Sequence, residues 1–123
     1  MHETDKPFSH LQSVLLPQEE MLDKQKKGKQ LKIGIVGELD PHETRVPLSP
    51  EGVEQLIDVG HEVLVEKDAG VGSRFSDHDY SEAGAQVIDE KEKLFTADIL
   101  LKISPLTEQE ISLLHGGQTI FSG

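Results

Sequence analysis

A short apolar run, followed by a polar loop and a helix start, constrains the fold of this chain most strongly. The run from Leu31 to Val36 is interrupted only by a lysine and a glycine, a pattern typical of a strand buried in a parallel sheet. Ser49 and Pro50 then supply an N-cap and a first helical residue. The loop from Gly37 to Leu48 is longer than the roughly 2–6 residues usual between strand and helix. We expect function in this loop, because ligands of open α/β sheets bind beyond the carboxyl ends of the strands.

Strand and helix patterns alternate along the rest of the chain. A helix with Val53, Leu56 and Ile57 on one face should end at Gly60. The further expected segments are a buried strand over His61–Glu66, a weak strand over Ala85–Ile88, a helical segment over Asp89–Phe95, a strong strand over Ala97–Ser104 and a last strand in QTIFS. This alternation, without a hairpin signal, predicts an α/β fold with a parallel, Rossmann-like (flavodoxin-like), three-layer sheet and right-handed crossovers.

Two capping boxes mark further helix starts in the second half of the chain. Ser76 with Asp79 predicts a short helix carrying Tyr80 and Ala83. Thr107 with Glu110 predicts another, with Ile111 and Leu114 on its inner face and Gly116 and Gly117 ending it.

Length and charge limit the domain organisation and the partners. The 123 residues suffice for one domain, which we place at residues 31–123 behind a polar extension over residues 1–30 with a short helix from Pro17 to Lys27. The last strand leaves no residue to cover it, so we interpret the chain as a cut segment. A net charge of −11 argues against nucleic acid or an anionic membrane as partner. Without cysteine, signal peptide or long apolar stretch, a soluble cytoplasmic protein is expected.

Two cations are the best candidates for a site. The Arg45 guanidinium matches a carboxylate bidentately, which suits an organic acid; alternatively Arg45 pairs with Glu43 or Glu38 to hold the loop. Lys102 lies near the carboxyl end of an apolar strand, where it is either held at a site or extends to solvent.

Signals for a bound cofactor or metal are weak. The glycines of DAGVGSRF resemble a dinucleotide fingerprint, but Phe75 stands in place of the third glycine, so we expect a tight turn and assign no cofactor-binding residue. The six histidines form no close pair on one helix face, so no metal site is predicted, and His42 is expected to face solvent.

Several separated motifs together resemble a known family. LKIGIVGE, HETRVPLSPEGVEQLIDVGHEVLVEKDAG, GSRFSDHDYSEAGA and ADILLKISPL are similar, in this order and spacing, to the amino-terminal segment of alanine dehydrogenases and of the α subunit of proton-translocating nicotinamide nucleotide transhydrogenase. The leader LLPQEEMLDKQKKGKQ favours the alanine dehydrogenase branch. A departure is Val36-Gly37-Glu38, where the family commonly has Pro-Lys-Glu.

The resemblance implies the first part of a discontinuous catalytic domain in an NAD-dependent alanine dehydrogenase. The parent would convert alanine, NAD and water to pyruvate, ammonia and NADH, with NAD held by a domain absent here and the full-length protein a homo-oligomer. Arg45 and Lys102 match the family's substrate-binding residues; Lys102 would also act catalytically by polarising the carbonyl or imine. The family's catalytic histidine lies beyond Gly123, so the isolated chain is expected to be inactive and to bind NAD negligibly. A transhydrogenase segment and a non-catalytic binding domain of the same fold are the alternatives.

Overall fold

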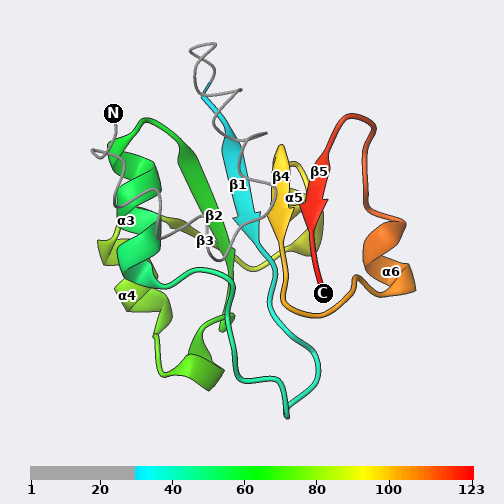
Figure 1. Cartoon of the computed structure of the whole chain (residues 1–123), viewed down its shortest axis with the longest axis horizontal. Coiled ribbons are helices and arrows are strands. Elements are labelled where there is room, and N and C mark those ends of the chain that lie inside the picture. The colour runs from blue at the N-terminus through cyan, green and yellow to red at the C-terminus, as the bar shows by residue number, and fades with distance from the viewer. Residues whose placement is uncertain (1–29) are drawn as a thin grey trace.

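The computed structural model describes residues 30–123 and contains a single parallel sheet with helices on both faces (Figure 1). The predicted extension and its helix from Pro17 to Lys27 lie outside the described residues. The elements are β1 (Lys32–Ile35), α3 (Pro50–Asp58), β2 (Glu62–Glu66), the 3₁₀ turn η2 (Val71–Ser73), α4 (Asp77–Glu82), β3 (Gln86–Ile88), α5 (Lys91–Leu94), β4 (Ile99–Leu101), α6 (Glu108–Ile111) and β5 (Thr119–Phe121).

The five strands lie in the order β3-β2-β1-β4-β5, and all pairs are parallel. In register, Ile33 lies between Val63 of β2 and Ile99 of β4. The α/β prediction with a parallel sheet is therefore confirmed. This is the strand order of the Rossmann fold. The flavodoxin-like fold has a different order, 2-1-3-4-5.

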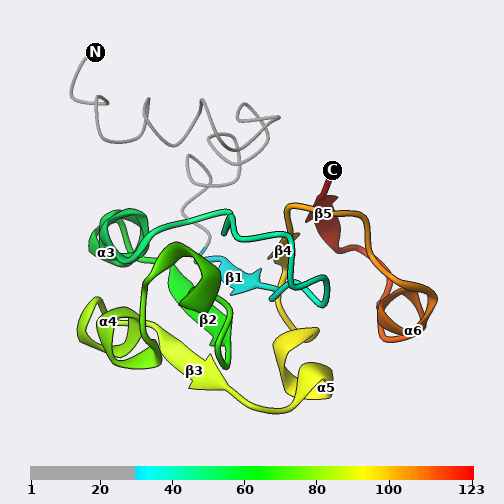
Figure 2. The same cartoon turned by 90° about the horizontal axis from the view of Figure 1, so that it is seen from below.

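Two apolar layers cover the sheet, one on each face. Figure 2 shows α3 and α4 on one side of the sheet and α5 and α6 on the other. The first layer joins alternate residues of the strands to Val53 and Leu56 of α3 and Tyr80 of α4. The second joins the opposite strand residues to Leu94 and Phe95 at α5. The three-layer prediction is confirmed, because helices cover both faces of the sheet. Each fully buried aliphatic side chain stabilises its layer by roughly 1.5–3 kcal/mol.

The predicted helix starts form as local hydrogen bonds. Ser49 Oγ accepts from the Gly52 amide at 3.2 Å, with Pro50 as the first helical residue. Both capping boxes are present, since the hydroxyl and the acid side chain of each pair satisfy the other residue's backbone amide. Gly60 has a positive φ of 102°, the conformation expected after a helix end.

The last helix and the strand before it are shorter than the sequence pattern indicates. β4 ends at Leu101, so Lys102 is the first residue beyond it, and α6 ends at Ile111. The prediction that Ile111 faces inward is wrong, because its side chain is exposed. Leu106, Leu113 and Leu114, which flank this short helix, pack against the core in its place. Among the described helices, none has the length and apolarity needed to cross a bilayer.

Candidate functional site

The candidate site lies where strand order reverses direction, between β1 and β4. These strands are neighbours, and the Val36 amide just beyond β1 donates to the Leu101 carbonyl at 2.9 Å. The chain after β1 proceeds toward β2 and α3 on one side, whereas the chain after β4 proceeds toward α6 and β5 on the other (Figures 1 and 2). Such a switch point opens a crevice at the carboxyl ends of the strands. Arg45 and Lys102 follow the two strands that flank it.

Arg45 extends from the long loop after β1 into solvent, with 72% of its side chain exposed. Its Nε and Nη2 donate to the two carboxylate oxygens of Glu43 at 2.8 and 2.9 Å. This pair keeps the pKa of Glu43 low, at about 2, and raises that of Arg45, to which the Glu38 charge also contributes. The predicted alternative of an Arg45–Glu43 pair is therefore present. It joins residues two positions apart in one loop, so it orients the guanidinium but does not tie the loop to the sheet.

The backbone next to Arg45 is held by the neighbouring turn. Ser73 Oγ of η2 donates to the Thr44 carbonyl at 2.5 Å. Gly72 lies so close that an added Cβ would be 2.9 Å from the Thr44 Cα. These contacts place the end of the Arg45 loop against the β2–α4 connection.

Lys102 is buried rather than extended to solvent. Its side chain is 2% exposed, and Nζ lies 2.7 Å from Glu110 Oε1 and 3.4 Å from the Pro105 carbonyl. Of the two expected states, a held lysine is the one observed, and the group that holds it is a carboxylate of α6. The same Glu110 oxygen accepts from the Thr107 amide at 2.9 Å, so the capping acid of α6 is also the counter-ion of Lys102.

A series of ion pairs with alternating charge continues from Lys102 and Glu110 along the edge of the sheet. Lys91 Nζ of α5 lies 2.8 Å from Glu110 Oε2 and 3.3 Å from Glu66 Oε2 at the end of β2. Glu66 Oε1 in turn accepts from the Gly37 amide at 2.7 Å. The ends of β1, β2 and β4 are therefore connected through the side chains of two helices.

The pKa values of this network show which charges are stabilised. Burial alone would raise the pKa of Glu110, yet the hydrogen bonds from Lys102 and Lys91 hold it at about 2. Burial also acts against the charge of Lys91, but Glu110 and Glu66 overcome it and raise the pKa of this lysine. Glu110 is thus a fixed anion between two cations.

Glu38 connects the loop after β1 to the exit of β4. Its Oε2 accepts from the Ile103 and Ser104 amides at 3.0 and 3.4 Å, and its Oε1 accepts from the Ser104 hydroxyl. The carboxylate therefore spans the switch point, with the Arg45 loop on one side and the residues directly after Lys102 on the other.

The two predicted site cations occupy separate places in this arrangement. Arg45 is bound to Glu43 at the loop surface, and Lys102 is bound to Glu110 beneath α6. The structure brings their backbones to one edge of the sheet but gives each its own carboxylate. The exposure predicted for His42 is confirmed.

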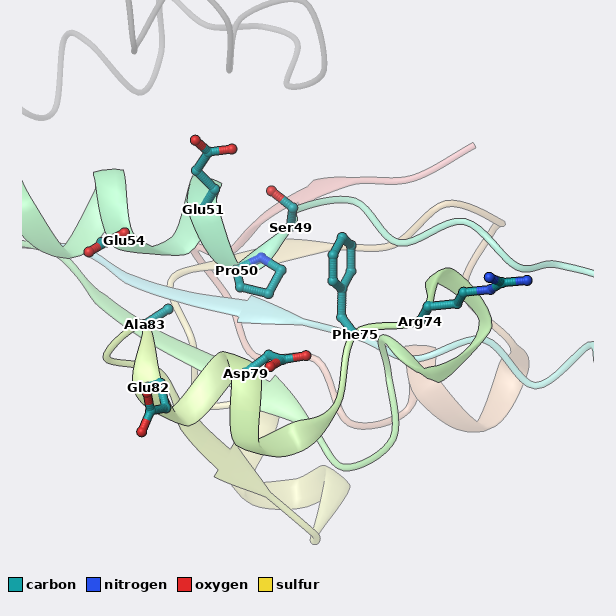
Figure 3. Close-up of a pocket in the computed structure, with 9 residues that line it drawn as sticks. All are labelled: Ser49, Pro50, Glu51, Glu54, Arg74, Phe75, Asp79, Glu82 and Ala83. Carbon is teal, nitrogen blue, oxygen red and sulfur yellow. The ribbon is translucent and has the colours of Figure 1, made fainter.

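A surface hollow of about 610 Å³ lies away from these residues, between the start of α3, the end of η2 and α4 (Figure 3). Its lining residues are Ser49, Pro50, Glu51, Glu54, Arg74, Phe75, Asp79, Glu82 and Ala83. Four carboxylates against one guanidinium make this hollow unfavourable for an organic anion. The switch point is therefore the better candidate site.

Comparison with protein families identifies the chain. The model of the family described as "Alanine dehydrogenase/PNT, N-terminal domain" matches residues 34–123. The chain belongs to this family. Alanine dehydrogenase of Staphylococcus epidermidis is 51% identical over 92 residues, and alanine dehydrogenase 2 of Staphylococcus aureus is 44% identical over the same length. Each match covers 75% of this chain, and the chain spans about a quarter of the length of these relatives, 25% in both cases.

Solved structures from both branches of the alanine dehydrogenase/PNT family share the fold. A transhydrogenase from Sinorhizobium meliloti is 40% identical with a TM-score of 0.70, covering 74% of this chain and 27% of that one. An L-alanine dehydrogenase is 35% identical with a TM-score of 0.71, covering 75% of this chain and 26% of that one. The resemblance stated from the motifs is confirmed.

NAD, the cofactor that the family implies, does not fit the glycine-containing loop of this segment. Gly72 packs against the Thr44 backbone, and an added Cβ at Gly70 would lie 2.6 Å from the Tyr80 ring. The glycines thus allow close internal packing, and η2, three residues long, gives no helix start for a pyrophosphate. Within residues 30–123 no three His, Cys, Asp or Glu side chains are grouped to hold a metal ion.

Most of the charged partners at this edge leave little trace in the sequence pattern. The capping box predicts only a cap role for Glu110, Glu38 is expected only as a partner of Arg45, and no motif marks Glu66 or Lys91. One signal was available, because a lysine in a buried run needs a counter-ion. The acid of the next capping box was the nearest candidate.

Proposed function

We propose that the protein carrying this chain is an NAD-dependent alanine dehydrogenase and that this chain forms part of its substrate site. The reaction is the oxidative deamination of alanine to pyruvate and ammonia. The contribution of the described residues is to bind and orient the substrate, and no step that uses NAD is assigned to them. NAD use, a homo-oligomeric assembly, a discontinuous catalytic domain and a cytoplasmic location belong to the same proposal.

The exposed guanidinium of Arg45, in the loop that leaves β1 at the switch point, carries this proposal. Two of its N–H groups donate to Glu43, which leaves three of the five for a ligand carboxylate. Glu43 fixes the plane of the fork before a ligand arrives, which lowers the entropy cost of binding. Arg45 is therefore assigned the carboxylate of alanine or pyruvate.

Lys102 is proposed as the second cation, which binds substrate and polarises its carbonyl or imine. In the described conformation its ammonium is buried against Glu110 at 2.7 Å. The proposed role therefore requires this pair to open when substrate binds. While the Lys102–Glu110 pair is closed, the Lys102 ammonium contacts Glu110 and not the substrate.

The second candidate function is that of a transhydrogenase α-subunit segment. The observation that favours it is the 40% identity to the Sinorhizobium meliloti transhydrogenase, which exceeds the 35% identity to the solved L-alanine dehydrogenase. Against it, the curated relatives with up to 51% identity are alanine dehydrogenases.

Two activity measurements separate these functions. The purified protein that carries this chain should form NADH from NAD only when L-alanine is added, and consume NADH with pyruvate and ammonium. Hydride transfer between NADH and an NADP analogue without alanine would instead indicate transhydrogenase chemistry. The absence of both activities would favour a non-catalytic domain.

A chimera tests the segment independently of its natural context. This chain's matched residues would replace the corresponding 92 residues of Staphylococcus epidermidis alanine dehydrogenase. We expect the chimera to retain alanine-dependent NADH formation, and a folded but inactive chimera would contradict the proposed function.

A further inference from the structure

The Glu38 carboxylate is the side chain that joins the two halves of the candidate site. It comes from the loop that carries Arg45, and it accepts from the Ile103 amide, the Ser104 amide and the Ser104 hydroxyl just after Lys102. We propose that Glu38 is a positioning residue that sets the distance between the Arg45 loop and the β4 exit, and thereby shapes the carboxylate-binding site. This inference rests on the proposed function.

The chemistry of Glu38 fits positioning better than direct contact with the substrate. A carboxylate beside an anion site would repel an organic acid unless its charge were compensated. Three donors from two consecutive residues compensate it here, and the nearby Arg45 guanidinium is stabilised by its field. Glu38 is half-buried, so its hydrogen bonds compete less with water than those of an exposed acid.

The residue before Glu38 is held by β2, the strand that flanks β1 on the side away from β4. The Gly37 amide donates to Glu66 at the end of β2, and Glu66 is held by Lys91. The first two loop residues beyond Val36 are therefore bound to both neighbouring strands, one through its amide and one through its side chain. Because the loop is attached in this way at its base, the position of Arg45 relative to the residues after β4 is restricted.

The test compares Glu38→Gln and Ser104→Ala with Glu62→Gln in the protein that carries this chain. Glutamine keeps the shape of Glu38 but replaces one acceptor oxygen with a donor, and Ser104→Ala removes one donor in a change that should leave the fold intact. Glu62 is exposed at the opposite end of β2, so its variant controls for the lost charge. The measurements are amide hydrogen exchange at residues 103 and 104, and KM for pyruvate and for NADH.

We expect Glu38→Gln to speed amide exchange at residues 103 and 104 and to raise the KM for pyruvate roughly 10-fold, with less than about a 2-fold change in the KM for NADH. Ser104→Ala should act in the same direction with a smaller effect, and Glu62→Gln should match the unchanged protein. Unaltered exchange in Glu38→Gln would overturn the connection itself. Faster exchange with an unaltered pyruvate KM would overturn the positioning role while leaving the proposed function intact. Absence of pyruvate turnover in the unchanged protein would overturn the proposed function and the positioning role together, and exchange would still decide whether the connection exists.

Discussion

Replacing Glu110 with glutamine should destabilise the fold by about 3 kcal/mol. Breaking a buried ion pair by removing one partner costs roughly 3–5 kcal/mol, because the other charge stays buried without compensation. The lower end of this range applies, because Lys91 is 22% exposed and keeps Glu66 as a partner. Lys102, at 2% exposure, keeps only uncharged acceptors, namely the amide oxygen of the new glutamine and the Pro105 carbonyl 3.4 Å away.

The pKa of Glu110 leads to a similar magnitude. At 1.36 kcal/mol per pKa unit, a change from 4.5 to about 2 corresponds to about 3 kcal/mol. Because the folded-state pKa is the lower one, this stabilisation is complete above about pH 4.5 and is lost as the pH falls toward about 2. Glu110→Gln should lack this part of the acid dependence.

Urea unfolding followed by far-ultraviolet circular dichroism measures both effects, at pH 7 and along an acid series. Glu62→Gln removes an exposed acid and serves as the control. The double variant Lys102→Met/Glu110→Leu should recover most of the loss, because apolar side chains of similar volume replace the pair. A cost below about 1 kcal/mol for Glu110→Gln, typical of exposed pairs, would refute the description of this pair as a buried one.

Two further predictions concern a buried histidine and the Arg45 loop. Burial lowers the pKa of His61, so the unfolded chain takes up a proton first, and the melting temperature should fall as pH drops below about 6.5. Thermal unfolding at about pH 7.5 and about pH 5.5 measures this, and an equal or higher melting temperature at the lower pH would contradict it. Gly72→Ala forces backbone apart at Thr44 and should raise the KM for alanine several-fold, as steady-state kinetics would show. Gly116→Ala, where an added Cβ meets nothing, is the control, and equal KM values in the two variants would contradict the prediction.

Local sequence patterns predicted the elements of this fold well. Ser49 with Pro50 and the two capping boxes act within four residues, so their hydrogen bonds follow from spacing alone. The sequence patterns did not predict that β1 and β4 are neighbours, because strand order depends on contacts distant in sequence. The shortness of α6 was also missed, because the apolar spacing does not show where Leu113 and Leu114 leave the helix.

The candidate site residues Arg45 and Lys102 were proposed from the sequence, and of their contacts only the Arg45–Glu43 pair was foreseen. Arg45 stood out because a guanidinium in a long carboxyl-end loop is chemically distinctive. The partner of Lys102 depends on how the chain turns between β4 and α6, and spacing alone does not determine that turn. Glu38 reaches Ile103 across 65 positions of sequence, which only the parallel pairing of β1 with β4 brings together.

The KM of Arg45→Lys for alanine tests the central claim most directly. Lysine keeps the positive charge but lacks the fork that binds a carboxylate through two parallel hydrogen bonds. Arg74→Lys, an exchange at another exposed arginine, is the matched control. In the protein that carries this chain, Arg45→Lys should raise the KM for alanine and pyruvate roughly 10-fold or more and leave the KM for NAD within about 2-fold, whereas Arg74→Lys should change neither. A lower melting temperature for Arg45→Lys with an unaltered KM for alanine would instead make Arg45 a structural residue of its loop and contradict the account.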